Sequence, residues 1–263
     1  MNFSDKVIWV TGASSGIGEA LAYAFSRQGA KLVLSARRGD ELERVRKLCD
    51  NPERHLIVPL DLEFPDDFPA KVAEVERTVG PIDILINNAG IGQRAYAKDT
   101  ALDVDRRVMA INYIGTVALT KAVLPAMLAR KSGQIVAVTS LVGHIGTPKR
   151  SSYAASKHAL HGFFDSLRAE VYDDNVKITI VCPGFIHTNF SVAALVGDGS
   201  AQNKMDDVQA NGYPATLCAE DILKGLAKGK DEFYVGRKEV YAVYLKRWFP
   251  SLFNRLIRKA KVT

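Results

Sequence analysis

The stretch SSYAASKHAL, residues 151–160, places Tyr153 four residues ahead of Lys157 among good helix formers. Residues four apart lie on one face of a helix, so the lysine ammonium is expected beside the tyrosine hydroxyl. That charge favours the phenolate and would hold the tyrosine pKa below its usual value of about 10, a difference of about 3–4 kcal/mol between the two protonation states. The pair therefore predicts a proton donor and acceptor that works near neutral pH.

A second copy of this spacing, Tyr234 and Lys238, lies in the stretch FYVGRK. Gly236 and the β-rich residues before it indicate the end of a strand rather than a helix. This second pair also lacks a serine partner. We therefore interpret Tyr234 and Lys238 as structural.

Further polar groups follow the apolar runs of the chain. Ser140 ends one run, NNAG (87–90) ends another, and PGFIHT (183–188) ends a third. The carboxyl ends of strands in an open α/β sheet meet at one edge, where such proteins bind their ligands. A serine hydroxyl there would give a developing oxyanion a second hydrogen bond and would orient a carbonyl group.

The sequence VTGASSGIG follows the first apolar run and opens the first helical segment. Its glycines allow a tight turn, a close approach to a pyrophosphate and a helix–strand contact, while the amides of the helix N-terminus face the phosphates. A purely structural turn is the alternative, but the strand before and the helix after favour a dinucleotide site. The residues expected to line it on this loop are Gly12, Ser14, Ser15, Gly16, Ile17 and Gly18.

The end of the second apolar run indicates which dinucleotide binds. NAD sites usually place an acidic residue there, but this chain has Ala36 followed by Arg37 and Arg38. A guanidinium can bind a 2′-phosphate, so we expect NADP(H) rather than NAD(H), with Arg37 better placed. The alternative is that both arginines only begin the next helix. After the third run, Asp61 and Leu62 are expected at the adenine, unless Asp61 caps the following helix.

Apolar runs of strand length alternate with longer amphipathic segments along the chain. Strands are expected at 6–10, 31–35, 55–60, 82–86, 134–139, 176–182 and 232–236, and helices near 16–28, 39–50, 65–79, 101–130, 152–172 and 219–228. The alternation predicts one doubly wound α/β domain over residues 1–237, with a mostly parallel sheet of about seven strands and helices on both faces. Two segments differ: 190–216 is a candidate substrate lid, and 238–263 is a basic amphipathic tail.

Charge and cysteine content narrow the function further. The net charge is +6, yet residues from 237 onward hold eight basic residues and one acidic residue, so the rest is close to neutral. This distribution argues against nucleic-acid binding. No run approaches the roughly 20 apolar residues of a membrane-spanning helix, and we see no secretory signal. Cys49, Cys182 and Cys218 lack metal-ligand spacing, so we expect buried thiols in a reducing cytoplasm and no metal site.

In combination, these motifs resemble the short-chain dehydrogenase/reductase family. T-G-x-x-x-G-x-G, N-N-A-G, the serine, Y-x-x-x-K and P-G occur in the family's order over roughly residues 5–190. The resemblance implies a Rossmann-type domain, oxidoreductase activity on CH–OH groups, a homodimer or homotetramer, and a catalytic tetrad of Asn112, Ser140, Tyr153 and Lys157. Asn112 would hold a helix distortion, or a water that feeds protons toward Lys157.

The same resemblance assigns the nicotinamide end of the cofactor site. The Ile186 amide and the Thr188 hydroxyl would hold the carboxamide group. The remaining expected contacts are Asn88, Ala89, Gly90, Tyr153, Lys157, Pro183 and Gly184. His144 and His187 have no partner at ligand spacing, so we expect both to line a substrate pocket.

The pocket walls are expected from 91–97, 141–147 and 190–216. Because Leu141, Val142, Ile145, Phe185 and much of 190–197 are apolar, we expect a hydrophobic carbonyl compound or secondary alcohol of the steroid, retinoid or oxo-lipid type. The chain also resembles the branch with 11β-hydroxysteroid dehydrogenase-like and retinoid-active reductases. The alternatives are a 3-oxoacyl-carrier-protein reductase and a non-catalytic NADP(H)-binding regulatory protein.

The tail combines an aromatic, apolar face with a basic one. Its apolar residues recur at helical spacing, three arginines share the other side, and Pro250 should end one helix and begin another. The residues concerned are Leu245, Trp248, Phe249, Leu252 and Leu256, with Arg247, Arg255 and Arg258. Such a helix either lies on a membrane surface or packs on its own domain or a neighbouring subunit. We expect a cytoplasmic protein, with peripheral membrane contact through this tail as one alternative.

Overall fold

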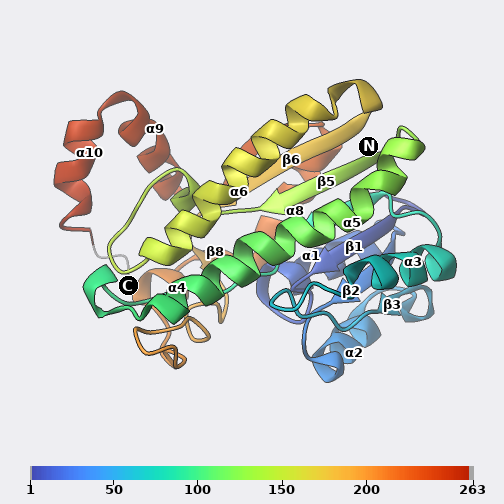
Figure 1. The fold of residues 1–263 in the computed structure, drawn as a ribbon, viewed down its shortest axis with the longest axis horizontal. Coiled ribbons are helices and arrows are strands. Elements are labelled where there is room, and N and C mark those ends of the chain that lie inside the picture. Colours follow the sequence, from blue (N-terminus) through green and yellow to red (C-terminus); the bar gives the residue numbers. More distant parts are fainter. Residues whose placement is uncertain (1, 261–263) are drawn as a thin grey trace.

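The computed structural model describes residues 2–260. Seven parallel strands form one sheet in the order β3-β2-β1-β4-β5-β6-β9. Figure 1 shows helices on both faces of this sheet. The strands are β1 Val7–Thr11, β2 Lys31–Ser35, β3 Leu56–Ile57, β4 Ile84–Asn87, β5 Gly133–Val138, β6 Val176–Pro183 and β9 Glu232–Val235. The predicted doubly wound α/β fold is confirmed.

Two apolar layers cover the sheet. Successive residues of a strand point to opposite faces, so Ile8 and Val10 join one core cluster while Val7 and Trp9 join the other. The first cluster includes residues of α1 Gly16–Ser26, α2 Gly39–Leu48 and α8 Ala215–Ala227, and the second includes α3 Phe68–Val79, α5 Thr116–Ala129 and α6 Ser151–Glu170. Burial on both faces explains why the strands read as uninterrupted apolar runs.

The segment expected as a single helix at 101–130 is helical from Leu102 to Ala129. It comprises α4 Leu102–Met109, a π-helical segment at Ala110–Gly115, and α5. Contrary to our expectation, this helix is long and apolar enough to cross a membrane by length and composition alone. Buried α5 residues such as Leu119 and Val123 belong to the core on one face of the sheet, so packing explains much of its apolar character.

Other differences from the expected elements lie at the carboxyl edge of the sheet. Strand β3 is only two residues long, and an additional small parallel sheet joins β7 Ile186–His187 to β8 Tyr213–Pro214. The candidate lid 190–216 contains β8 and the short helix α7 Asp207–Ala210. Its residues Ser191 and Asp206 are buried, so the described structure fixes this segment against the body at these points.

The tail forms two short helices, α9 Tyr241–Trp248 and α10 Pro250–Ile257, so the predicted break at Pro250 is confirmed. They project from one end of the molecule (Figure 1). Val243 and Phe253 are buried, whereas Trp248 is 72% exposed and Phe249 62% exposed. Over the described residues the tail therefore packs on its own domain through Val243, while much of the predicted apolar face is exposed; Lys261, one of the counted basic residues, lies outside them.

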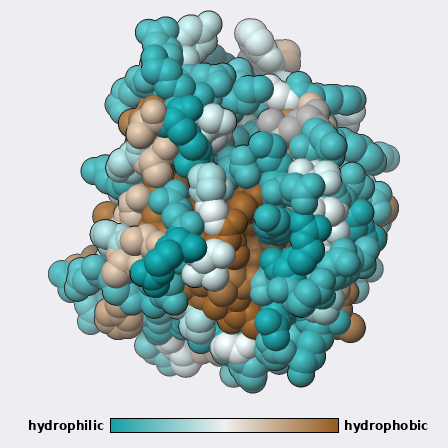
Figure 2. Space-filling view, turned by 90° about the vertical axis from the view of Figure 1, so that its right-hand side faces the viewer, coloured by the Kyte–Doolittle hydropathy of each residue, from teal (hydrophilic) through white to brown (hydrophobic). Residues whose placement is uncertain are grey.

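The opposite end of the molecule is the amino edge of the sheet, because the strand arrows point away from it in Figure 1. That end is mostly hydrophilic with an apolar hollow near its centre (Figure 2). Between the ends of α3 and α5 the described residues leave a shallow cavity of about 460 Å³ lined by Glu76, Pro81, Ala126, Ala129 and Arg130. The groups predicted to do chemistry all lie elsewhere, at the carboxyl edge.

Candidate active site

Four predicted segments meet at the carboxyl edge of β4, β5 and β6. They are NNAG (87–90), Ser140, the stretch with Tyr153 and Lys157, and PGFIHT (183–188). Ser140 follows β5, and its hydroxyl donates to the Pro183 carbonyl at the end of β6 at 3.3 Å while accepting from the Val142 amide at 3.3 Å. Its side chain also hydrogen-bonds Tyr153; burial raises the tyrosine pKa, and this bond opposes part of that rise. Ser140 therefore connects the turn that contains Pro183 and Gly184 to Tyr153.

Tyr153 and Lys157 lie on one face of α6, as their spacing predicts. Tyr153 is 9% exposed and Lys157 is 4% exposed. The Lys157 Nζ donates to the Val138 carbonyl at 3.0 Å and lies 5.8 Å from the centre of the Tyr153 ring. The second pair is divided between β9 and a 3₁₀ turn at Lys238–Val240, where the Tyr234 hydroxyl donates to Glu232 at 3.0 Å. No helix joins that pair, as we expected.

The electrostatics of Tyr153 differ from the sequence-based expectation. Burial raises its pKa, and the opposing positive charges are those of Arg94 and Arg150 rather than that of Lys157. Burial also lowers the pKa of Lys157 to about 8, since a charged ammonium is poorly solvated there. The lysine therefore lies beside the phenol, but two arginines outside the predicted motif provide the favourable charge.

Asn112 lies in the π-helical segment between α4 and α5 and is fully buried. Its Oδ1 accepts from the Ile91 amide at 2.8 Å, and its Nδ2 donates to the Ile91 carbonyl at 2.9 Å and to Ser156 Oγ at 3.0 Å. A Cβ at Gly90 would lie 3.0 Å from Asn112 Oδ1 and 3.7 Å from Lys157 Nζ. The distortion expected at Asn112 is present, and it connects the NNAG loop to α6.

The glycine loop and the NNAG loop are tied together at the end of β1. Thr11 Oγ1 accepts from the Asn88 amide at 3.0 Å and from the Ala89 amide at 3.1 Å. Gly12 has a φ of +67°, and a Cβ there would lie 2.9 Å from Ala89 Cα. Only glycine satisfies both conditions without strain.

An open cavity of about 600 Å³ lies over the N-terminus of α1. The predicted residues Ser14, Ser15, Gly16 and Thr188 line it, together with the neighbouring His187. The full set of lining residues also includes Glu19, Ala20, Tyr23, Arg38, Glu41, Arg44, Asn189, Ala215 and Thr216. Helix N-terminal amides, two serine hydroxyls and an arginine form a donor set that suits a phosphate-bearing nucleotide.

Arginine placement differs in part from the expectation. Arg37 and Arg38 are both exposed, but Arg38 rather than Arg37 lines the cavity. Arg44 lines it as well, held by Glu19 at 2.7 Å and Glu41 at 2.8 Å. Arg44 could not be recognised from its spacing, because a charge at that position is typical of an ordinary solvated helix face.

Asp61 and Leu62 lie at the carboxyl edge after β3. The Asp61 Oδ1 accepts from the Glu63 amide at 3.0 Å, and α3 begins only at Phe68. The alternative that Asp61 caps this helix is therefore wrong. Leu62 is buried against the π-helical segment, where a Cβ at Gly115 would overlap it.

The turn after β6 brings the last predicted residues to the glycine loop. The Gly184 amide donates a hydrogen bond to the Val235 carbonyl at 2.7 Å, and Ile186 is 3% exposed in β7. A Cβ at Gly16 would lie 3.1 Å from Thr188 Cγ2, so the turn and the glycine loop are in contact. Thr188 Oγ1 accepts from Gln209 Nε2 at 3.1 Å, which joins α7 to this turn.

A buried ion cluster beside Tyr153 was missed by the sequence analysis. Asp206 Oδ2 lies 2.7 Å from Arg94 Nε and 3.4 Å from Arg150 Nη2, and all three side chains are at most 6% exposed. These residues come from the loop after β4, the start of α6 and the candidate lid. Their separations of 56 and 112 residues leave no local pattern that could reveal them.

The expected apolar wall is present in part. Leu141, Val142 and Ile145 are buried, and the Phe190 ring lies 5.5 Å from the Tyr153 ring. Phe185 packs against the Arg150 guanidinium at 5.4 Å. The region around Tyr153 is therefore apolar on one side and charged on the other.

His144 has no partner nearby in the sequence, but the fold places two distant side chains, Cys182 and His161, beside it. Its Nε2 lies 3.7 Å from Cys182 Sγ and its ring centre 4.2 Å from that of His161. Cys49, Cys182 and Cys218 are free and buried, as expected. His187 is exposed on β7 and lines the nucleotide cavity rather than a closed pocket.

Comparison with known proteins agrees with this geometry. Residues 6–195 match the family model described as short chain dehydrogenase. The chain is 46% identical to the dehydrogenase/reductase SDR family protein 7-like of Anopheles gambiae, covering 98% of this chain and 84% of that protein. It is 45% identical to dehydrogenase/reductase SDR family member 7B of Mus musculus, covering 96% and 80%, respectively. A short-chain dehydrogenase structure from Streptomyces avermitilis superposes with a TM-score of 0.81 at 28% identity, covering 97% of this chain and 96% of that one.

Proposed function

This chain belongs to the short-chain dehydrogenase/reductase family, and on that premise we propose that it is an NADP(H)-dependent oxidoreductase acting on a hydrophobic carbonyl compound or secondary alcohol. One observation carries the proposal: Ser140, Tyr153, Lys157 and Asn112 converge at the carboxyl edge, beside the glycine loop and its cavity. A nucleotide-binding protein without catalysis would not need this convergence.

The cofactor, when bound, would supply or accept the hydride. The residues that would hold its phosphates are Ser14, Ser15 and the amides at Gly16 and Ile17, while Thr188 and Ile186 would hold the nicotinamide end. The cavity over α1 and the contact between Gly16 and Thr188 support this placement, because they bring both sets to one surface.

Proton transfer is assigned to Tyr153. Its hydroxyl would donate to the substrate oxygen in reduction and accept from the alcohol in oxidation. Ser140 Oγ, which hydrogen-bonds Tyr153 and makes long contacts of 3.3 Å with Pro183 and Val142, would hold the same substrate oxygen. Lys157, anchored on the Val138 carbonyl, would keep the phenol in place and restore its proton.

The preference for NADP(H) rests on charge at the end of β2. No carboxylate follows this strand at position 36, and two exposed arginines come directly after it, of which Arg38 faces the cavity. A ribose 2′-phosphate at this position would meet guanidinium donors and no fixed negative charge from β2. Glu41, which lines the same cavity, is engaged by Arg44 at 2.8 Å.

The substrate proposal rests on the side chains around Tyr153. Val142, Ala154 and Phe190 form an apolar cluster with it. A bulky apolar carbonyl compound, of steroid, retinoid or oxo-lipid type, would bury its hydrocarbon surface there at about 25 cal/mol per Å². Small polar ketones would gain little from this wall.

We also propose that the protein is cytoplasmic and touches membranes through the tail. Over the part of the tail that the structure describes, six large apolar side chains are exposed, and basic side chains alternate with them, as in interfacial helices. The six residues are Tyr241, Tyr244, Trp248, Phe249, Leu252 and Leu256. Truncation after residue 238 should abolish binding to anionic vesicles; unchanged vesicle binding would refute this contact.

A substrate screen tests the enzyme proposal. Steroid, retinoid and long-chain oxo-lipid carbonyls are incubated with NADPH and with NADH, and turnover is followed at the nicotinamide absorbance. We expect NADPH-dependent turnover, and in Tyr153→Phe a loss in kcat of about 100-fold or more with nucleotide affinity retained. Tyr234→Phe is the matched control and should keep its activity. Turnover limited to sugars or small polar ketones would refute the substrate class, and full activity of Tyr153→Phe would refute the mechanism.

A further inference from the structure

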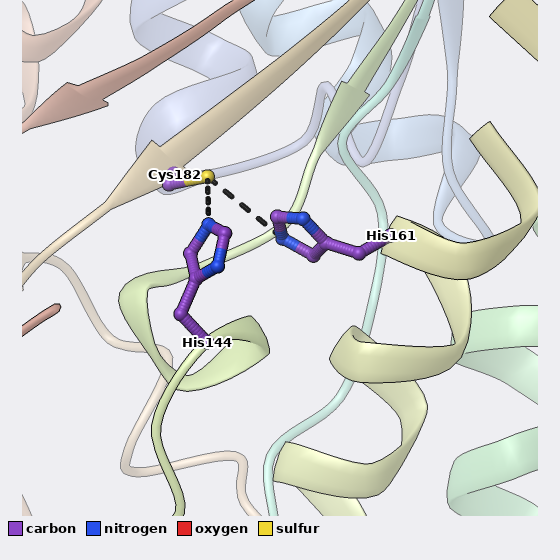
Figure 3. Close-up of side chains that lie close together, drawn as sticks. All are labelled: His144, His161 and Cys182. Atoms are coloured by element: carbon purple, nitrogen blue, oxygen red, sulfur yellow. Dashed lines mark hydrogen bonds between the residues drawn. The ribbon is translucent and has the colours of Figure 1, made fainter. Parts of the chain in front are cut away.

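Three potential metal ligands, His144, His161 and Cys182, lie close together (Figure 3). His144 follows the 3₁₀ turn Leu141–Gly143, His161 lies on α6 and Cys182 lies on β6. Cys182 Sγ is 3.7 Å from His144 Nε2 and 3.8 Å from His161 Nε2. One ligand atom from each residue lies within 4.8 Å of the other two.

The Glu232 carboxylate on β9 lies beside both imidazoles. Its Oε1 lies 3.2 Å from His144 Nε2, and its Oε2 lies 3.8 Å from His161 Nδ1. Two imidazoles, a thiolate and a carboxylate are a ligand set typical of zinc. Zinc bonds of about 2.0–2.3 Å in a tetrahedron place neighbouring donors about 3.3–3.6 Å apart. The two thiol–imidazole separations of 3.7 and 3.8 Å, and the 3.2 Å between Glu232 Oε1 and His144 Nε2, are within a few tenths of an ångström of these values.

We propose that His144, His161 and Cys182, with Glu232, form a binding site for a zinc ion. The ion would lie between the three side chains drawn in Figure 3. It would replace the thiol proton of Cys182, which leaves to solvent. The proposal does not depend on the carbonyl chemistry, since none of these four residues has a role in it.

The surroundings already hold the ligands in place. A histidine that binds metal through one nitrogen usually donates from the other to a fixed acceptor. His161 Nε2 is the nitrogen that faces Cys182, and its other nitrogen, Nδ1, faces Glu232 Oε2 at 3.8 Å. Thr139 Oγ1 lies 3.1 Å from Nε2 and helps to orient the ring. Glu232 in turn accepts from the Tyr234 hydroxyl at 3.0 Å.

The site is closed on one side and open on the other. Cys182 is fully buried and the His161 side chain is 10% exposed, whereas those of His144 and Glu232 are 25% and 30% exposed. An ion can therefore enter past His144 and Glu232. A Cβ at Gly143 would lie 2.6 Å from His161 Nε2, so the glycine there allows the imidazole to reach its position.

The ligands belong to the same elements as the catalytic groups. His144 lies four residues after Ser140, His161 four residues after Lys157, and Cys182 directly before Pro183. A metal ion would link the segment after the 3₁₀ turn, α6 and β6, and would hold them at fixed distances from one another. We therefore expect the ion to stabilise the folded chain, because the site does not exist in the unfolded one.

Cobalt is the probe, because Co²⁺ occupies zinc sites and reports its ligands by absorption. The full-length, reduced, chelator-treated protein is titrated with Co²⁺. We expect one cobalt ion per chain, the charge-transfer band of a cobalt–thiolate bond and the visible bands of tetrahedral cobalt, all lost when Zn²⁺ is added. Absence of the thiolate band at about tenfold excess of Co²⁺ would overturn the proposal.

Matched variants identify the ligands. Cys182→Ser should remove the thiolate band, whereas Cys218→Ser, at an equally buried thiol, and His158→Gln, at an exposed histidine on the same helix, should keep it. His144→Gln should weaken Co²⁺ binding by about tenfold or more. If circular dichroism shows that Cys182→Ser does not fold, the Co²⁺ affinity of His144→Gln alone tests the site. A band that persists in Cys182→Ser, or an unchanged affinity in His144→Gln, would refute the site.

Discussion

Replacing Asp206 by asparagine tests whether the buried ion cluster holds the 190–216 segment on the body. The substitution keeps the shape of the side chain and removes its charge. Asp206 Oδ2 faces Arg94 at 2.7 Å and Arg150 at 3.4 Å, while Oδ1 accepts from Gln202 Nε2 at 3.0 Å. Since donors face both oxygens, an amide at this position must turn its NH₂ group toward one of them in either orientation.

The expected cost follows from burial. Arg94 and Asp206 are each 3% exposed, so solvent cannot replace the lost charge. Removal of one partner from a buried ion pair typically costs about 3–5 kcal/mol of stability. For a domain of this size each kcal/mol lowers Tm by about 2–4 °C, so Asp206→Asn should lower Tm by roughly 10 °C.

Urea unfolding followed by far-ultraviolet circular dichroism measures the difference. Asp207→Asn is the matched control, because it removes the same charge at the next, exposed residue and should stay within about 0.5 kcal/mol of the wild type. If Asp206→Asn also stays within that range, the cluster does not hold the segment, and our account of its role is wrong.

Three more changes have expected outcomes. His55 Nδ1 accepts from the Leu32 amide, and burial lowers the His55 pKa, so the free energy of unfolding should fall as the pH drops below about 6.5. In urea unfolding, His55→Gln should make this fall with pH less steep. An equally steep fall in the variant would contradict the role of His55. Gly12→Ala adds a Cβ at positive φ against Ala89, which should cost about 2–4 kcal/mol in the same assay; a loss below about 0.5 kcal/mol would contradict the strain. Arg38→Ala should raise KM for NADPH about tenfold and leave KM for NADH unchanged. Arg37→Ala should raise KM for NADPH less. Equal effects of Arg38→Ala on both nucleotides would show that Arg38 does not bind the 2′-phosphate.

The residues that gather at the carboxyl edge of the sheet could be predicted, because short stretches of sequence indicate each strand and where it ends. Each apolar run predicts a buried strand, and the alternation of these runs with helices predicts a parallel, doubly wound sheet. In such a sheet the residues that follow the strands must meet at one edge, which is why Ser140 and the NNAG loop could be placed beside Tyr153. The helical period alone placed Lys157 on the same face as Tyr153.

Local patterns left some positions open. For Asp61 the alternative of a helix cap is wrong, because α3 begins at Phe68, beyond its reach, while the expected adenine contact stays a prediction. Arg37 and Arg38 are adjacent, and only the path of the backbone into α2 turns the second toward the cavity. The pKa of Tyr153 was expected to respond to Lys157, whereas burial and two arginines from other segments decide its direction.

The sequence by itself determined the layers of this protein, the edge at which its motifs gather and the pairing of Tyr153 with Lys157, since all three follow from periods of two and 3.6 residues. Only the tertiary structure decided which distant side chains touch: Arg94 with Asp206, and His144 with His161 and Cys182. Those contacts depend on how each element is rotated and shifted against its neighbours. That arrangement comes from packing over the whole core, which no spacing within one segment records.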